Sequence, residues 1–65
     1  MAANDPNARL APREFASLLE VSKGIMQHPI PVQHKTALIK LGFVVEAPGG
    51  LALTEIGKQR VAAGR

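Results

Sequence analysis

Few side chains in this sequence could carry out acid–base or nucleophilic chemistry. The only histidines, six residues apart, are His28 and His34. The hydroxyl side chains that could act as nucleophiles are Ser17, Ser22, Thr36 and Thr54. An enzyme needs a nucleophile, an acid–base pair or a metal in a defined arrangement, and two histidines without a cysteine or a nearby carboxylate make a poor zinc site. The sequence therefore predicts no catalytic residue, no metal site and no enzymatic activity.

The glycine pair Gly49-Gly50 could in principle approach a phosphate group. A phosphate-binding loop would also need a helix directly after it and an attached Lys-Ser or Lys-Thr pair, and the sequence offers neither. We interpret the pair as a turn, and we predict no cofactor and no small-molecule ligand.

The charge of the chain is modest and unevenly distributed. Eight Lys and Arg residues against five Asp and Glu residues give a net charge of +3. No acidic residue occurs between Val21 and Val45, a stretch that contains Lys23, Lys35 and Lys40. Clustered positive charge is the electrostatic footprint of a nucleic-acid surface, but charge runs also form solvated faces. Both interpretations remain open at this point.

Length and composition define the kind of domain that must position these residues. A chain of 65 residues is one domain near the lower size limit of unaided folding. Phe15 and Phe43 are its only aromatic residues and cysteine is absent, so an aliphatic core must stabilise it. No apolar run approaches the roughly 18 residues of a membrane span, and segment 1–7 is too polar for a signal peptide. We expect a cytoplasmic protein with a disordered tail over 1–9 and a single domain over 10–65.

The order of helix and turn signals predicts an α+β fold. Pro12 and Glu14 favour a helix start, Gly24 and Gly42 are helix stops, and Thr54 is a good N-cap. Runs rich in Val, Phe and Leu on either side of a Pro-Gly-Gly turn predict a hairpin. The predicted elements are a helix over 12–22, an irregular connector over 24–31 with a short helical turn near 25–27, a helix over 32–41, strands over 43–47 and 51–53, and a helix over 55–63.

Apolar spacing predicts the core. His34 and Leu38 share the core face of the second helix. Gly57 lies inside the last helix, where glycine costs about 1 kcal/mol relative to alanine, so we expect its backbone to contact a neighbour closely. The side chains expected to be buried are Phe15, Leu18, Leu19, Leu38, Leu41, Phe43, Leu53 and Val61, and those expected to anchor the connector are Ile25, Met26 and Ile30.

The segment 33–61 contains a longer pattern of helix, short hairpin and helix. Its motifs are Leu41-Gly42-Phe43-Val44 at the end of the first helix and Leu53-Thr54-Glu55-Ile56-Gly57-Lys58 at the start of the second. This segment resembles the C-terminal half of a winged helix-turn-helix domain, as found in small bacterial DNA-binding proteins. The resemblance covers 29 of the 65 residues and implies a winged-helix-like fold: helix, connector, helix, two-stranded hairpin, helix.

The resemblance makes the helix over 32–41 a recognition helix. Its outer face carries Gln33, Thr36 and Lys40, with Lys35 beside them. Gln and Thr side chains can contact base edges, and Lys can contact phosphate or guanine. The implied function is double-stranded DNA binding, in a transcriptional regulator that acts as a homodimer, since helix-turn-helix domains commonly bind as dimers.

A second function from a different class is also open. The predicted hairpin carries Glu46 and no basic residue, which does not favour a phosphate backbone. The apolar side chains Met26, Ile30, Val32 and Ile39 could instead form a patch for another protein or for a second copy. In that case the chain would be a small interaction or adaptor module that has the fold without DNA binding.

Overall fold

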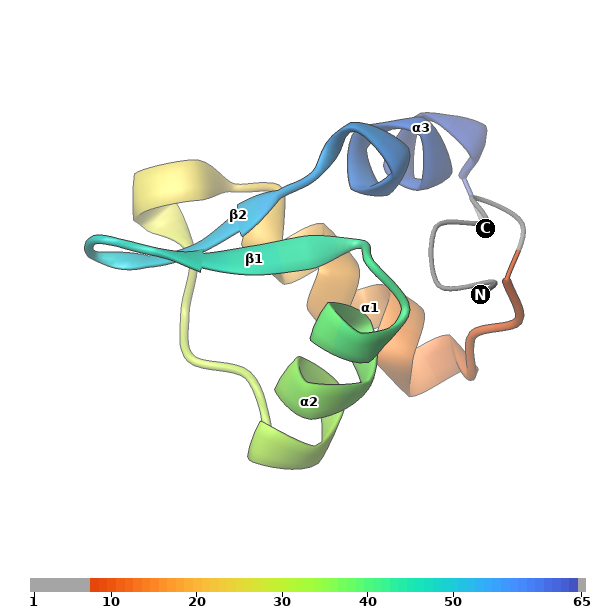
Figure 1. Cartoon of the computed structure of the whole chain (residues 1–65), viewed down its shortest axis with the longest axis horizontal. Coiled ribbons are helices and arrows are strands. Elements are labelled where there is room, and N and C mark those ends of the chain that lie inside the picture. The colour runs from red at the N-terminus through yellow and green to blue at the C-terminus, as the bar shows by residue number, and fades with distance from the viewer. Residues whose placement is uncertain (1–7, 65) are drawn as a thin grey trace.

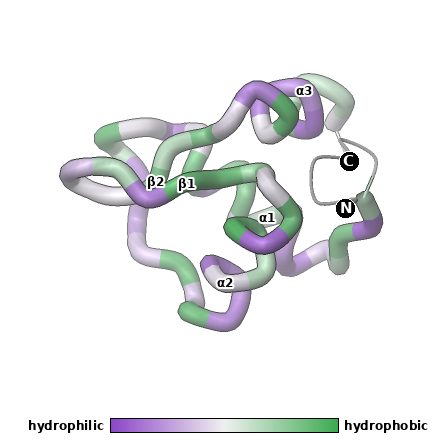
Figure 2. The backbone as a smooth tube through the Cα atoms, in the orientation of Figure 1, coloured by the Kyte–Doolittle hydropathy of each residue, from purple (hydrophilic) through white to green (hydrophobic). Residues whose placement is uncertain are grey.

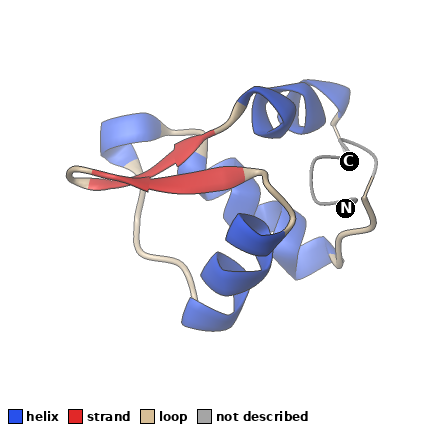
Figure 3. Ribbon diagram, in the orientation of Figure 1, coloured by secondary structure: helices blue, strands red, loops and turns tan. Residues whose placement is uncertain are grey.

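The computed structural model describes residues 8–64 and has an α+β architecture. Three α-helices, one 3-10 turn and one two-stranded antiparallel hairpin make up this part of the chain (Figures 1 and 3). The α+β fold expected from the sequence is confirmed at this level. The elements are α1 (Pro12–Val21), η2 (Gly24–Met26), α2 (Val32–Lys40), β1 (Val44–Ala47), β2 (Gly50–Leu53) and α3 (Glu55–Ala63).

Helix boundaries follow the local signals closely. The first helix begins at Pro12, and the Glu14 carboxylate accepts a hydrogen bond from the backbone N–H of Ala11 at 2.9 Å. The last helix ends at Ala63 and is capped by Gly64, which has a φ of 81°. Its bounds match the prediction, whereas α1 and α2 each end one residue earlier than expected. The predicted helical turn in the connector is present one residue earlier, as η2.

The hairpin pairs β1 with β2 directly after α2. Gly42 has a φ of 84°, a conformation that glycine adopts without steric penalty, and it turns the chain from the helix into the strand. Val44 lies opposite Leu53 and Glu46 opposite Leu51. Because opposite residues share one face of a sheet, these four side chains lie on the same face, and Val44 is fully buried there. The second half of the fold is thereby packed onto the helices.

The junction between the hairpin and α3 is built from backbone contacts. Thr54 caps α3, since its hydroxyl oxygen accepts from the N–H of Gly57 at 3.1 Å and its hydroxyl donates to the carbonyl of Gly42 at 2.5 Å. Gly57 is buried against Phe43: a Cβ at this position would overlap the Phe43 carbonyl oxygen and lie 3.1 Å from the carbonyl carbon. The close backbone contact predicted for Gly57 is confirmed.

A small aliphatic core joins α1, α2 and β1. Figure 2 shows the apolar stretch where β1 begins, between the helices. Among the described residues, the buried apolar side chains are Leu18, Val21, Leu38, Phe43 and Val44. Side chains that are half-buried and pack against this core include Ala8, Leu10, Phe15, Ile30, Leu41, Leu51, Leu53, Ile56 and Val61. Of the predicted anchors, Leu18, Leu38 and Phe43 are buried, whereas Phe15, Leu41, Leu53 and Val61 are only half-buried. Val21 and Val44 are also buried, and the sequence pattern did not single them out.

Three predicted apolar contacts are wrong. Leu19 is 39% exposed, because α1 turns Ser17 and Val21 inward with Leu18 and leaves Leu19 at the margin. Ile25 and Met26 do not anchor the connector: they project from η2 and are 99% and 71% exposed.

The N-terminal end of the described segment is attached to α3. The Arg60 guanidinium donates a hydrogen bond to the backbone carbonyl of Ala8. It also lies over the Phe43 ring, 5.6 Å from the ring centroid, in a cation–π arrangement. Residues 1–7 of the predicted tail lie outside the described residues.

Candidate functional site

Helix α2 has one packed face and one open face. Leu38 is fully buried, and Ala37 and Leu41 are half-buried on the same side. His34, predicted to face the core, is half-buried, and its Nδ1 lies 2.7 Å from the Ser17 hydroxyl oxygen of α1. This hydrogen bond explains why a polar residue occupies a buried position of α1, and it fixes the orientation of α2 on α1.

The open face of α2 carries three of the four predicted DNA-contacting residues. Gln33, Thr36 and Lys40 are all exposed. They occupy positions i, i+3 and i+7, so they lie along one side of the helix. At 1.5 Å per residue they span about 10 Å of the helix axis. The structure therefore brings these three polar side chains together on a solvent-facing surface.

The fourth predicted residue, Lys35, is engaged with the hairpin. Its Nζ lies 2.8 Å from Oε2 of Glu46 on β1. The bond from Lys35 holds the pKa of the Glu46 carboxyl below its usual value. Both side chains remain partly exposed, and such surface pairs contribute only about 0–1 kcal/mol. Lys35 is thus bridged to an acid at the side of α2 that faces the hairpin.

A second acid neutralises the other end of the basic stretch. Glu20 of α1 accepts from Lys23 Nζ at 3.0 Å and from the backbone N–H of His28 at 2.5 Å, and it pairs with His28 Nδ1 at 2.9 Å. The His28 backbone bond, followed by Lys23, lowers the pKa of Glu20 to about 2. The sequence pattern missed the partners Glu20 and Glu46, because both lie outside the stretch that has no acid. Lys40 is the lysine of this stretch that has no ion pair within residues 8–64.

The apolar residues of the alternative interface come from two parts of the fold. Val32 and Ile39 lie on α2 and are 70% and 38% exposed. Ile30 is half-buried and packs against the core. Met26 lies on η2, which contacts β2, whereas α2 contacts β1 (Figure 1). Val32 and Ile39 thus lie on α2, and Met26 and Ile30 lie in the segment that precedes it.

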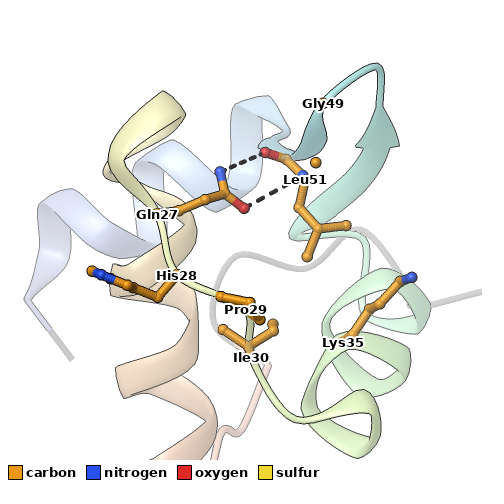
Figure 4. Close-up of a pocket in the computed structure, with 8 residues that line it drawn as sticks. Gln27, His28, Pro29, Ile30, Lys35, Gly49 and Leu51 are labelled. Carbon is orange, nitrogen blue, oxygen red and sulfur yellow. Dashed lines mark hydrogen bonds between the residues drawn. The ribbon is translucent and has the colours of Figure 1, made fainter.

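A groove separates the connector from α2 and the hairpin. It has a volume of about 350 Å³, and its lining includes Pro29, Ile30, Lys35 and Leu51. Figure 4 shows Gln27 at one wall: its Nε2 donates to the Leu51 carbonyl at 3.0 Å, and its Oε1 accepts from the Leu51 N–H at 3.4 Å. The side-chain amide thus bonds to the outer edge of β2 as a neighbouring strand would. Sequence reasoning missed this role, since nothing local marks Gln27.

The two histidines have separate partners. His34 is paired with Ser17, and His28 points away from the groove (Figure 4) toward Glu20, a carboxylate neighbour that the sequence analysis did not expect. No three potential metal-ligating side chains come together among the residues that the structure describes. Over the same residues, each helix is too short or too polar to cross a bilayer.

Comparisons with protein-family models, curated proteins and solved structures find no match for this chain.

Proposed function

We propose that this chain is a winged-helix-like domain that binds double-stranded DNA through the open face of α2. The observation that carries the proposal is the alignment of Gln33, Thr36 and Lys40 on an exposed helix face whose opposite side is packed on α1 and β1. The nine residues of α2 give a helix about 13 Å long. The diameter of a helix with its side chains, about 10–12 Å, fits the major groove, which is about 12 Å wide.

Each residue of this face has a distinct expected contact. The Gln33 amide can donate to and accept from the edge of an adenine, and the Thr36 hydroxyl and methyl suit a base edge or a thymine methyl. Lys40 contacts phosphate or guanine. The 10 Å between the first and last of these residues corresponds to about three base pairs at 3.4 Å each. One copy therefore reads a short half-site, and a transcriptional regulator of this kind would act as a homodimer.

The ion pair between Lys35 and Glu46 is compatible with this function. A phosphate oxygen can replace the Glu46 carboxylate, and an exposed pair of this type is weak enough to exchange. The hairpin carries no basic residue between Val44 and Leu53, so phosphate contacts come from α2. We therefore expect weaker DNA binding and a shallower salt dependence than in domains whose hairpin is basic.

Titration of random-sequence duplex DNA at two salt concentrations tests the proposal. Log K falls with log salt by about 0.9 for each phosphate contact, so two contacts give a slope near −2. The double variant Lys35→Ala and Lys40→Ala should weaken binding on every duplex and flatten this slope. Lys58→Ala, on the exposed surface of α3, is the matched control and should change little. Absence of binding by the unaltered protein at low salt would exclude the function.

Contacts to the DNA bases predict a different experimental result from contacts to phosphate. Gln33→Ala should reduce affinity for some sequences more than for others, because it removes a base contact and no charge. A selection from randomised duplexes, carried out with the unaltered chain and with this variant, measures the difference. An identical preferred sequence in both selections would show that Gln33 reads no base.

The alternative function is a protein-interaction module that uses the same helix. Val32, at 70% exposure, favours it, and Ile39 lies two turns further along α2. Ile39→Asp places a charge in any such interface and should abolish partner binding. An adaptor of this class would show no DNA affinity and would lose its partner in this variant.

A further inference from the structure

Two large apolar side chains stand almost fully in solvent on η2. Ile25 is 99% exposed and Met26 is 71% exposed, the highest values among the large apolar residues described. They are neighbours in the chain, so they form one apolar projection. Isolated exposed apolar residues are common on protein surfaces, but two adjacent ones on a three-residue turn form a protruding contact surface. We call this pair the apolar knob.

The knob is held in place by hydrogen bonds. The N–H of Gln27 donates to the carbonyl of Gly24 at 3.0 Å, and Gln27 Nε2 donates to the same carbonyl at 2.8 Å. Through the amide bonds to Leu51, Gln27 also fixes the turn to β2. Gly24 has a φ of 67°, which a residue with a Cβ adopts only at a cost. The fold therefore presents the knob in a defined orientation, and little conformational entropy is lost when it is buried.

The groove described above begins beside the knob. Gln27 is at once the residue after Met26 and a wall of the groove, as Figure 4 shows with η2 next to it. The lining includes the apolar side chains of Pro29, Ile30 and Leu51, and the volume of about 350 Å³ lies in the range of clefts that bind ligands. A projection and a hollow of matching apolar character thus lie next to each other on one chain.

We propose that the apolar knob inserts into the groove of a second copy of this chain, forming a two-fold symmetric dimer. In a two-fold symmetric dimer, the knob of each copy meets the groove of the other copy. Because the knob and the groove lie next to each other on one chain, both insertions can occur in the same dimer. Two reciprocal insertions close the assembly and leave neither knob exposed.

The charges around this surface permit the association. Lys23, next to the knob, is paired with Glu20, and Lys35, at the groove, is paired with Glu46. Each edge therefore has no net local charge, and two copies meet without strong repulsion. An interface limited to the knob and the groove would fall in the size range of weak and transient complexes, below about 1,200 Å² in total. This inference does not depend on DNA binding.

Analytical ultracentrifugation over a range from about 1 µM to 1 mM tests the dimer. The unaltered chain should shift from monomer to dimer within this range. Ile25→Glu should raise the dissociation constant at least about 100-fold, because two isoleucine side chains per dimer lose their burial. The fold should persist, since Ile25 contacts no core residue, and a thermal melt followed by circular dichroism checks this. Val32→Glu, at another exposed apolar site, on α2, is the control and should leave the dimer intact.

Cross-linking tests the pairing itself. The sequence has no cysteine, so Ile25→Cys in one chain and Pro29→Cys in another give single, defined thiols. Mixed under oxidising conditions, these variants should form a disulfide heterodimer in higher yield than Val32→Cys mixed with Pro29→Cys. Equal yields would overturn the knob-in-groove arrangement.

Three results would overturn the proposal as a whole. The unaltered chain could remain monomeric at 1 mM, or Val32→Glu could disrupt the dimer while Ile25→Glu does not. Alternatively, vesicles containing anionic lipid could bind the monomer in a manner lost in Ile25→Glu, which would make the knob a membrane contact.

Discussion

The two junctions that surround the central helix α2 are built in opposite ways. After α2, the hairpin and α3 are locked by backbone contacts, with Gly57 buried against the Phe43 carbonyl and Thr54 capping α3. Before α2, the connector is held by polar side chains, with Gln27 on the edge of β2 and Glu20 on the backbone of His28. The first junction buries Phe43 and Gly57, whereas the second leaves Ile25 in solvent.

This difference separates the rigid part of the fold from the part that can bind. A buried backbone contact tolerates no change of side-chain volume, because dense interiors have no space to absorb it. A connector held by side-chain amides and carboxylates keeps its shape while its other residues vary. Both surfaces proposed to bind, the open face of α2 and the apolar knob with its groove, lie outside the hairpin–α3 junction.

The strongest test of the contrast is Gly57→Ala. In an exposed helix this change would stabilise by about 1 kcal/mol. Here the new Cβ would overlap the Phe43 carbonyl and approach Leu53 Cδ2 to 3.4 Å. We expect a loss of at least about 3 kcal/mol, at the upper end of the effects of overpacking. Urea denaturation measures it.

The same helix offers the control. Ala62→Gly, at an exposed position of α3, should cost about 1 kcal/mol from backbone entropy alone. If Gly57→Ala were as stable as the unaltered protein, α3 would not lie against Phe43 as described.

A smaller effect is expected at the connector. Gln27→Met keeps the length of the side chain and removes its hydrogen bonds to Leu51 and Gly24. Since neutral hydrogen bonds contribute about 0.5–1.5 kcal/mol each and the freed groups reach water in part, the loss should be about 1–2 kcal/mol. The Leu51 amide should also exchange its hydrogen faster. The control is Gln33→Met, on the open face of α2, which should change the free energy of unfolding by less than about 0.5 kcal/mol. An equal loss of stability in both variants would show that Gln27 does not hold the connector.

The smallest effect concerns pH. The folded chain holds the pKa of Glu20 at about 2, below the ordinary value of 4.5. Because the folded pKa is depressed, the stabilisation by ionised Glu20 is complete above pH 4.5 and is lost as the pH falls toward 2. Urea midpoints of the unaltered chain and of Glu20→Gln should therefore show their full difference above pH 4.5 and converge near pH 2. A difference that stays constant over this range would show that the Glu20 charge does not stabilise the connector.

The sequence was most informative at the hairpin–α3 junction. Gly42, Thr54 and Gly57 each carry a local requirement: a positive φ, a cap or the absence of a Cβ. Such requirements depend on the backbone near the residue, so the residue type reveals them. The bounds of α3 and the position of the turn into β1 followed from these signals.

The contacts of the connector and the ion pairs of the lysines could not be predicted from local signals. The ion pairs of Lys35 and Lys23 and the bonds of Gln27 join residues whose proximity depends on packing. The apolar spacing of α1 misplaced Leu19, because the hydrogen bond of Ser17 with His34 makes a polar position suitable for burial. Thus the open face of α2 was predictable from helical periodicity, whereas the ion pair of Lys35 with Glu46 at the margin of that face was not.

The contact between Arg60 and the carbonyl of Ala8 has a consequence for the order of the elements. It places the start of the described segment beside the last turn of α3, so the chain path nearly closes on itself. Nearby ends at the surface are the condition for circular permutation and for insertion into a host loop. A rearranged chain could join these ends through a short linker and open at the exposed Gly49 turn. It would keep the same core, since the packing of α1, α2 and β1 does not require the polypeptide to start where it does.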